Sequence, residues 1–243
     1  MYIKSFLKNI YKKILYGYKS SSKSYIKYLQ KRGVAIGKNV TFYEPNTNYI
    51  DTQKSWMIEI GNNVEITRGV VIITHDYAWS VIKQLNGKII GSRSKVSIGN
   101  NVFIGMNTVI LQGVTIGDNV IIGANTLVNR DIPSNSIVAG NPGKVISNVN
   151  QYIEKREKKQ IFEAKELFVE YYNKYNEIPP KEIFDEFFWI FERRNKEKLP
   201  KKFIEKMKLT GNEEISNKLF FETEPYFDGY NQFIKYCLEG EKR

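Results

Sequence analysis

An aliphatic residue returns at every sixth position from residue 98 to residue 122, and this spacing constrains the fold more than any other feature of the chain. A period of six fits neither an amphipathic helix nor a single alternating strand. It is typical of a β-solenoid, in which each hexad supplies a short strand and a turn, and three hexads close a coil of about 18 residues. Stacked coils would bury the repeated residues in inward columns that no single repeat could form. Five hexads begin in register at Ile98, Ile104, Ile110, Ile116 and Ile122.

Glycine and asparagine stand where such a coil would turn. Both residue types adopt positive φ at low cost, which suits a tight corner between two strands. We therefore expect corners of this kind at Gly99, Asn100, Asn107, Gly117 and Asn125.

The longest interruption of the repeat runs from residue 78 to residue 95. A loop of this length should project from one edge of the solenoid, and long loops in compact domains are often functional. The only histidine of the chain, His75, lies beside this loop. A lone histidine is ordinarily a surface or packed residue, but a neutral imidazole can accept the proton of an attacking alcohol. His75 is therefore a candidate catalytic base.

The segment from Val96 to Ile146, with its closing run Ala-Gly-Asn-Pro-Gly-Lys-Val-Ile, resembles the hexapeptide-repeat acyltransferases. Its pattern is similar to that of maltose, galactoside and surface-polysaccharide O-acetyltransferases. The resemblance covers about half of the chain. It implies a left-handed parallel β-helix, a homotrimer with active sites between subunits, and acetyl-coenzyme A as the acyl donor.

The same resemblance assigns roles to individual residues. It makes His75, in its Thr-His context, the general base of a direct transfer, and the backbone amide of Met106 a donor to the oxyanion. Asn48 and Asp51 are the candidates for a helper residue on the preceding coil. The implied coenzyme A contacts are Met106, Ala124, Asn129, Arg130 and Lys144, although Arg130 could instead be a solvated corner charge.

Asp76 and Trp79 are candidates because they lie close to His75 in the sequence. Asp76 could orient the imidazole, but adjacent residues of a strand face opposite ways, so we expect a backbone carbonyl to take that role. Trp79 could stack on a sugar ring of the acceptor or flank the thioester. Alternatively, it could anchor the loop to a neighbouring subunit.

Residues 1–32 form a basic arm with nine lysines and arginines and no acidic residue, in a chain of net charge +11. Apolar residues recur at helical spacing, which predicts a basic amphipathic helix. Such a helix could cap the open end of the solenoid or contact anionic lipids, and the two roles are compatible. Nucleic acid is not expected as a partner, because no binding motif accompanies the charge. The apolar residues are Ile3, Phe6, Leu7, Ile10, Ile14 and Leu15.

The composition changes after Val149, where glycine becomes rare and lysine, glutamate and aromatic residues dominate. We expect a solenoid domain over residues 33–149 and a helical domain over residues 150–243. Pro179 and Pro180 should end one helix and begin the next. The aromatic residues could form a sugar-binding platform, but a small helical domain also needs bulky residues for its core.

The totals exclude several classes of protein. One cysteine, Cys237, excludes an internal disulfide, and one histidine argues against a zinc site, so we expect no metal. No apolar run reaches the roughly 18–20 residues that span a bilayer, which favours a cytoplasmic protein. The basic arm is compatible with a peripheral position at the inner membrane face. We predict an O-acetyltransferase that uses acetyl-coenzyme A and a surface-polysaccharide sugar or its precursor. An N-acyltransferase of an amino sugar nucleotide and a non-catalytic membrane-associated scaffold are the alternatives.

Overall fold

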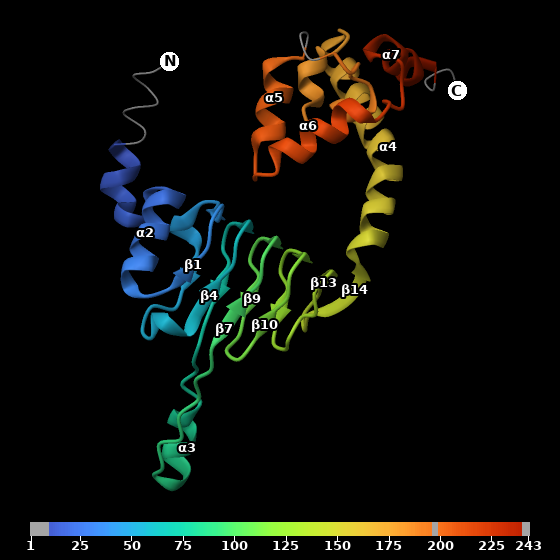
Figure 1. The fold of residues 1–243 in the computed structure, drawn as a ribbon. Helices are drawn as coiled ribbons and strands as arrows, with labels where there is room; N and C mark the ends of the chain where they lie inside the picture. Colours follow the sequence, from blue (N-terminus) through green and yellow to red (C-terminus); the bar gives the residue numbers. More distant parts are fainter. Residues whose placement is uncertain (1–9, 196–198, 240–243) are drawn as a thin grey trace. The chain divides into compact units, whose positions relative to one another are not determined.

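The computed structural model describes residues 10–195 and 199–239, and the chain divides into two compact units, residues 1–152 and residues 153–243 (Figure 1). The strands from β1 to β12 enter three sheets in rotation, so that strands three places apart are hydrogen-bonded neighbours, and β13 and β14 extend the second sheet. The paired strands run parallel except for the last pair, β13 and β14. The predicted β-solenoid is therefore present. The first sheet contains β1 (Ala35–Ile36), β4 (Ile58–Ile60), β7 (Val96–Ile98) and β10 (Thr115–Ile116); the second contains β2 (Thr41–Phe42), β5 (Val64–Ile66), β8 (Val102–Ile104), β11 (Val120–Ile122), β13 (Ser136–Ala139) and β14 (Lys144–Asn148); the third contains β3 (Tyr49–Ile50), β6 (Val71–Ile72), β9 (Val109–Ile110) and β12 (Leu127–Val128).

The strand register measures the length of each coil. Ser97 pairs with Thr115, 18 residues further on, which is the coil length that three hexads predict. The preceding coil is longer, because Glu59 pairs with Ser97, 38 residues further on. The additional residues form the loop between β6 and β7, which carries helix α3 (Trp79–Asn86) and projects from the solenoid in Figure 1.

The first residue of each hexad points into the solenoid. The five isoleucines that begin the hexads are at most 4% exposed and belong to one continuous hydrophobic core. Burying an isoleucine side chain stabilises a fold by about 1.5–3 kcal/mol, so these columns supply much of the driving force for stacking. This part of the prediction is confirmed.

The corner residues correct the sequence analysis. Asn107 and Asn125 have φ near 57°, as predicted, but Gly99, Asn100 and Gly117 do not have positive φ. Asn101 and Asn119 take the left-handed conformation instead. A Cβ atom at Gly99 would lie 2.8 Å from the carbonyl carbon of Gly117, so glycine is needed there for close stacking of coils.

The amino-terminal arm is divided into short helices, which corrects the prediction of one amphipathic helix. Residues 10–16 are helical, and a 3-10 turn, η1 (Gly17–Ser20), leads to helix α2 (Ser22–Arg32). Ser21 and Ser24 form a capping box at the start of α2, and Gly33 ends the helix with φ of 106°. Tyr25 and Leu29 of α2 are buried in the solenoid core, so α2 is the cap. Residues 1–9, with the predicted apolar positions Ile3, Phe6 and Leu7, lie outside the described residues.

The second unit has a core of aromatic side chains. Helix α4 (Val149–Tyr175) begins at the end of the first unit and contributes most of its length to the second. The helix predicted after Pro180 is replaced by two 3-10 turns, η4 (Lys181–Phe184) and η5 (Phe188–Ile190), followed by α5 (Lys201–Lys208), α6 (Glu213–Glu222) and α7 (Tyr230–Glu239). Most of the phenylalanines here are buried together, which supports a structural role for the aromatic residues. Cys237 is also buried, and burial raises the pKa of its thiol to about 12.

None of the helices among the described residues combines the length and the apolar character that crossing a bilayer requires. Two further 3-10 turns, η2 (Pro45–Thr47) and η3 (Ser55–Met57), flank β3 and fill the stretch where the hexad pattern lapses.

Candidate active site

His75 lies where the chain leaves the solenoid to form the projecting loop. It follows β6, and a β-bridge joins it to Arg93 on the returning leg of the loop. The amide of Ser94 donates to the carbonyl of Thr74 at 3.0 Å, which joins the outgoing and returning segments of the loop at its base. His75 is thus held by regular backbone hydrogen bonds at the edge of a rigid coil.

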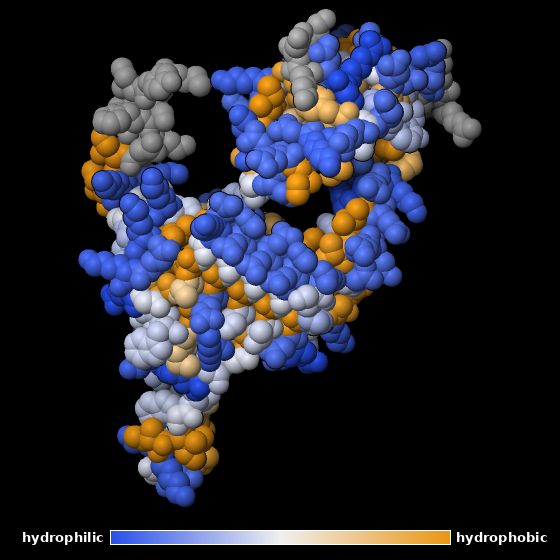
Figure 2. Space-filling view, in the orientation of Figure 1, coloured by the Kyte–Doolittle hydropathy of each residue, from blue (hydrophilic) through white to orange (hydrophobic). Residues whose placement is uncertain are grey.

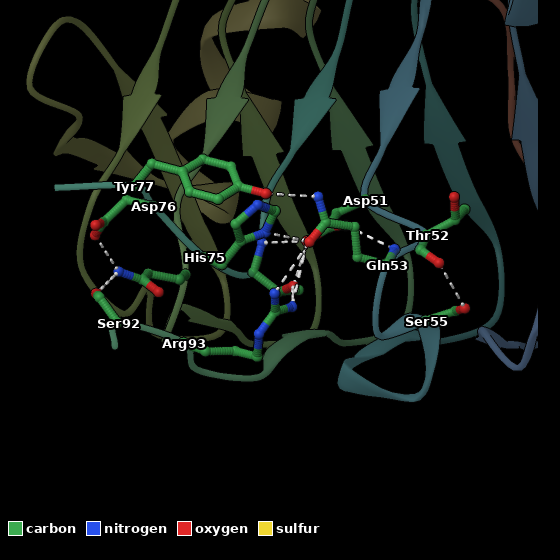
Figure 3. Close-up of polar contacts among 11 residues, drawn as sticks. Asp51, Thr52, Gln53, Ser55, His75, Asp76, Tyr77, Ser92 and Arg93 are labelled. Atoms are coloured by element: carbon green, nitrogen blue, oxygen red, sulfur yellow. Dashed lines mark hydrogen bonds and ion pairs between the residues drawn. The ribbon is translucent and has the colours of Figure 1, made fainter. Parts of the chain in front are cut away.

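The imidazole of His75 is hydrogen-bonded to a buried carboxylate (Figure 3). Its Nδ1 lies 2.7 Å from Oδ2 of Asp51, whose side chain is fully buried, while the His75 side chain is 10% exposed. Asp51 reaches this position because β3 pairs with β6, with Ile50 opposite Ile72. An ionised carboxylate can only accept hydrogen bonds, so Nδ1 carries the proton and Nε2 is left as the basic nitrogen.

Several donors converge on the carboxylate of Asp51. Its Oδ1 accepts from the Gln53 amide at 2.9 Å, and its Oδ2 accepts from both the hydroxyl and the amide of Thr74. Burial disfavours the charged form, but the hydrogen bonds from Thr74, Gln53 and His75 outweigh it and hold the pKa of Asp51 below its usual value. Asp51 is therefore ionised at neutral pH and fixes the tautomer of His75.

A second layer of side chains surrounds this pair. Arg93 donates to Thr74 Oγ1 at 3.1 Å and to Gln53 Oε1 at 3.3 Å, and its Nη1 lies 3.8 Å from Asp51 Oδ2. Gln53 in turn donates to the hydroxyl of Tyr77 at 3.1 Å. The ring of Tyr77 stands perpendicular to that of His75, with the centroids 5.1 Å apart. These contacts leave the imidazole little freedom to rotate.

Sequence reasoning gave Gln53, Tyr77 and Arg93 no part in the site. Arg93 offered a weak signal, since it is a charged residue at the end of the loop that begins near His75. Gln53 offered none, because its relation to His75 depends on coil register in the irregular stretch after Phe42. Tyr77 lies two residues after His75, but nothing in the sequence singled it out.

The structure also places the other candidates near the histidine. Asp76 turns away from the imidazole: its Oδ1 accepts from the Ala78 amide at 2.9 Å and its Oδ2 from Gln112 at 2.8 Å. The expectation that a backbone carbonyl orients His75 is wrong, because Asp51 occupies that position. Trp79 opens helix α3 and contacts the edge of Tyr77, with ring centroids 6.1 Å apart.

Asn48 has a structural position. Its side chain is buried and accepts from the amide of Val70 at 3.1 Å, which ties η2 to the coil beneath. No hydrogen bond joins it to His75 within the described residues. Of the two helper candidates, only Asp51 contacts the histidine.

The residues expected to contact coenzyme A lie on the surface of the later coils. Met106 and Ala124 occupy the same corner of successive coils, where the amide of Asn125 donates to the carbonyl of Met106 at 2.7 Å. The amide of Met106 has no acceptor among the described residues, as expected for a corner, and is available to a ligand. All five candidates are exposed: Met106, Ala124, Asn129, Arg130 and Lys144.

No hydrogen bond joins any of these five residues to His75 in the part of the chain that the structure describes. The same part contains no group of three or more histidine, cysteine or acidic side chains that could hold a metal ion.

The lowered pKa of Asp51 predicts a pH-dependent contribution to stability. A carboxyl group with a lower pKa in the folded state stabilises the fold above its unfolded pKa, and this contribution is lost as the pH falls through the folded value. We expect Asp51→Asn to have a lower free energy of unfolding than the wild type at neutral pH. The difference should shrink as the pH falls below about 4. Urea unfolding across this range measures it.

The matched control is Asp228→Asn, because the side chain of Asp228 is 80% exposed and its ion pair with Arg193 should contribute little. A deficit in Asp51→Asn that stays constant with pH would show that lost packing, and not lost charge, causes it.

Comparison with known proteins identifies the family. Residues 95–130 match the family described as bacterial transferase hexapeptide (six repeats). Protein CapG of Staphylococcus aureus is 44% identical over 124 residues, which are 51% of this chain and 71% of CapG. The chain belongs to the hexapeptide-repeat transferase family. The resemblance of the segment from Val96 to Ile146 is thereby confirmed.

Two further comparisons define the extent of this similarity. Galactoside O-acetyltransferase of Escherichia coli (strain K12) is 37% identical over 118 residues, which are 48% of this hexapeptide-repeat protein. The match covers about half, 55%, of that relative. A solved maltose O-acetyltransferase from Clostridium difficile 630 is 30% identical, with a TM-score of 0.40, over 52% of this chain and 75% of that one.

Proposed function

We propose that this chain transfers an acetyl group from acetyl-coenzyme A to a hydroxyl group of a carbohydrate, a sugar of a surface polysaccharide or its precursor. The observation that carries the proposal is the pair formed by His75 and the buried, ionised Asp51 beside the projecting loop. Similarity to a galactoside O-acetyltransferase supports a sugar hydroxyl as the acceptor.

The geometry supports direct transfer with His75 as the base. Nε2 of His75 takes the proton of the acceptor hydroxyl while the oxygen attacks the thioester carbonyl, which forms a tetrahedral intermediate. The oxyanion accepts a hydrogen bond from the free amide of Met106. The carbon–sulfur bond then breaks, and the imidazolium returns the proton to the departing thiolate. Asp51 holds Nδ1–H and stabilises the imidazolium throughout.

The proposal places the active site between subunits. The support for this part of the proposal is the resemblance of residues 96–146 to the hexapeptide-repeat acyltransferases, which implies sites between the subunits of a trimer. The proposal includes a left-handed solenoid and a homotrimer, in which Met106, Ala124, Asn129, Arg130 and Lys144 form the coenzyme A groove.

The alternatives have less support. A buried carboxylate is costly to keep charged, and a scaffold without catalytic activity would have no need of one that fixes a histidine tautomer. An N-acyltransferase could use the same base, so only the acceptor distinguishes it from the proposed enzyme.

An assay with matched acceptors tests the proposal. We expect the purified chain to release coenzyme A from acetyl-coenzyme A when a neutral sugar acceptor is present, and to form an alkali-labile ester. Each hydroxyl acceptor is compared with the amino sugar that differs only at one position, and His75→Ala serves as the blank. Transfer confined to the amino sugars would establish N-acylation. The absence of transfer to any acceptor would contradict the proposal.

A further inference from the structure

The helix formed by residues 10–16 exposes its apolar side chains. Ile14 is 80% exposed, Tyr11 65%, Leu15 54% and Ile10 41%. Helix α2, by contrast, buries its apolar residues in the solenoid. The two functions expected of the arm are therefore divided: α2 caps the core, and the apolar face of residues 10–16 is uncovered within the described part of the first unit. Figure 2 shows apolar surface over this first helix.

The exposed side chains lie on one side of the helix. At about 100° per residue, Ile10, Ile14, Tyr11 and Leu15 fall within a sector of roughly 140°. Lys12 and Lys13 occupy the opposite side. An apolar stripe flanked by lysines is the pattern of a helix that lies in the plane of a membrane surface.

Helix α2 adds further exposed lysines to the arm. Lys23, Lys27 and Lys31 are spaced by four residues and exposed, so they line one side of the helix. None of these three lysines, nor Lys12 or Lys13, has an ion-pair partner among the described residues, and residues 10–32 contain no acidic side chain. Their charge is thus available to an anionic partner.

We propose that residues 10–32 dock the chain on an anionic lipid surface, with the apolar stripe of residues 10–16 at the boundary between headgroups and acyl chains. Charge complementarity selects this occupant: two copies of the helix packed together would bring unpaired lysines close to one another, whereas anionic headgroups neutralise them. The surface is formed by residues other than the His75 site, so docking is independent of the transfer reaction.

Vesicle co-sedimentation of the full chain tests this surface. We expect binding to phosphatidylcholine vesicles that contain phosphatidylglycerol, and at least about tenfold weaker binding to phosphatidylcholine alone. Raising NaCl from about 0.1 M to about 0.5 M should weaken the binding, because salt screens the lysines. Equal binding to both vesicles, or no binding to either, would overturn the proposal.

Matched variants separate the contributions of apolar and charged side chains. Leu15→Asp and the pair Lys12→Glu with Lys13→Glu should each lower vesicle binding about tenfold or more. Leu209→Asp, at a site of similar exposure in the second unit (58%), and Lys155→Glu with Lys158→Glu should leave binding unchanged.

Two control measurements keep the result interpretable. Transfer activity in solution should be unchanged in all these variants, which also shows that they are folded. If Leu15→Asp instead changes the oligomeric state in the absence of lipid, the face is an interface between copies of this chain, and the lipid proposal is wrong.

Discussion

Replacement of His75 by alanine is expected to lower kcat by about 10²- to 10⁴-fold, the range typical of a lost general base. KM for acetyl-coenzyme A should change little, because the expected donor contacts lie on the later coils and not beside His75. Steady-state kinetics of coenzyme A release at neutral pH, with a saturating sugar acceptor, measure both constants. Activity equal to that of the wild type would end the assignment of His75 as the base.

Substitution of Asp51 tests whether this carboxylate acts through the imidazole of His75. Asp51→Asn cannot accept hydrogen bonds at both oxygens, so it loses some of the donors that now converge from His75, Thr74 and Gln53. If Asp51 acts through the imidazole, the double variant should be no slower than His75→Ala alone, because removal of either partner abolishes the same interaction. Losses that simply multiply would show that Asp51 has an independent role.

The fold was predictable because a period of six has one common structural solution. The inward isoleucines and the coil length of 18 residues follow directly from that period. The break in the pattern also indicated where to look for chemistry, since the only histidine lies beside it. A local spacing rule was enough for each of these features.

The partner of His75 could not be chosen from the sequence. The hexads lapse between Phe42 and Ile58, so the number of residues in that coil was unknown and Asn48 and Asp51 were equivalent candidates. The parallel pairing of β3 with β6 fixes the register and brings Asp51 to His75. Arg93 depends in the same way on how the loop closes.

The amino-terminal arm shows a second limit of periodicity. The apolar residues from Ile3 to Leu15 follow helical spacing, but this spacing does not reveal which of them face the protein. Gly17 has φ of 55° and Ser21 caps the next helix, so the chain turns between the two segments. One segment packs on the core and the other does not.

The corner glycines lead to the prediction with the largest effect on stability. A Cβ atom at Gly99 would lie 2.6 Å from Asp118 Oδ1 and 2.8 Å from the carbonyl carbon and oxygen of Gly117. Asp118 cannot move without loss of its hydrogen bonds from Asn100. The Gly117 atoms belong to the backbone of the next coil and cannot move aside as a side chain could. Gly99→Ala must therefore separate two coils where the amide of Gly99 donates to Ile116 at 2.8 Å.

We expect Gly99→Ala to lower the free energy of unfolding by about 3 kcal/mol, the upper part of the range for overpacking. For a unit of this size the melting temperature should fall by roughly 6–12 °C, as measured from the β-sheet circular dichroism signal. Gly123→Ala is the matched control, because Gly123 also follows the first isoleucine of a hexad, but its added Cβ would meet Ala139 Cβ at 3.4 Å and the carbonyl oxygen of Val138 at 3.5 Å, which are ordinary contact distances.

The two variants should change the free energy of unfolding in opposite directions. Gly123 has no positive φ, so alanine there restricts the unfolded chain without straining the fold and should raise stability by about 0.4–1 kcal/mol. If both variants were equally destabilising, the cause would be the backbone conformation of the corner. Close stacking of the coils would then not be the reason for glycine at residue 99.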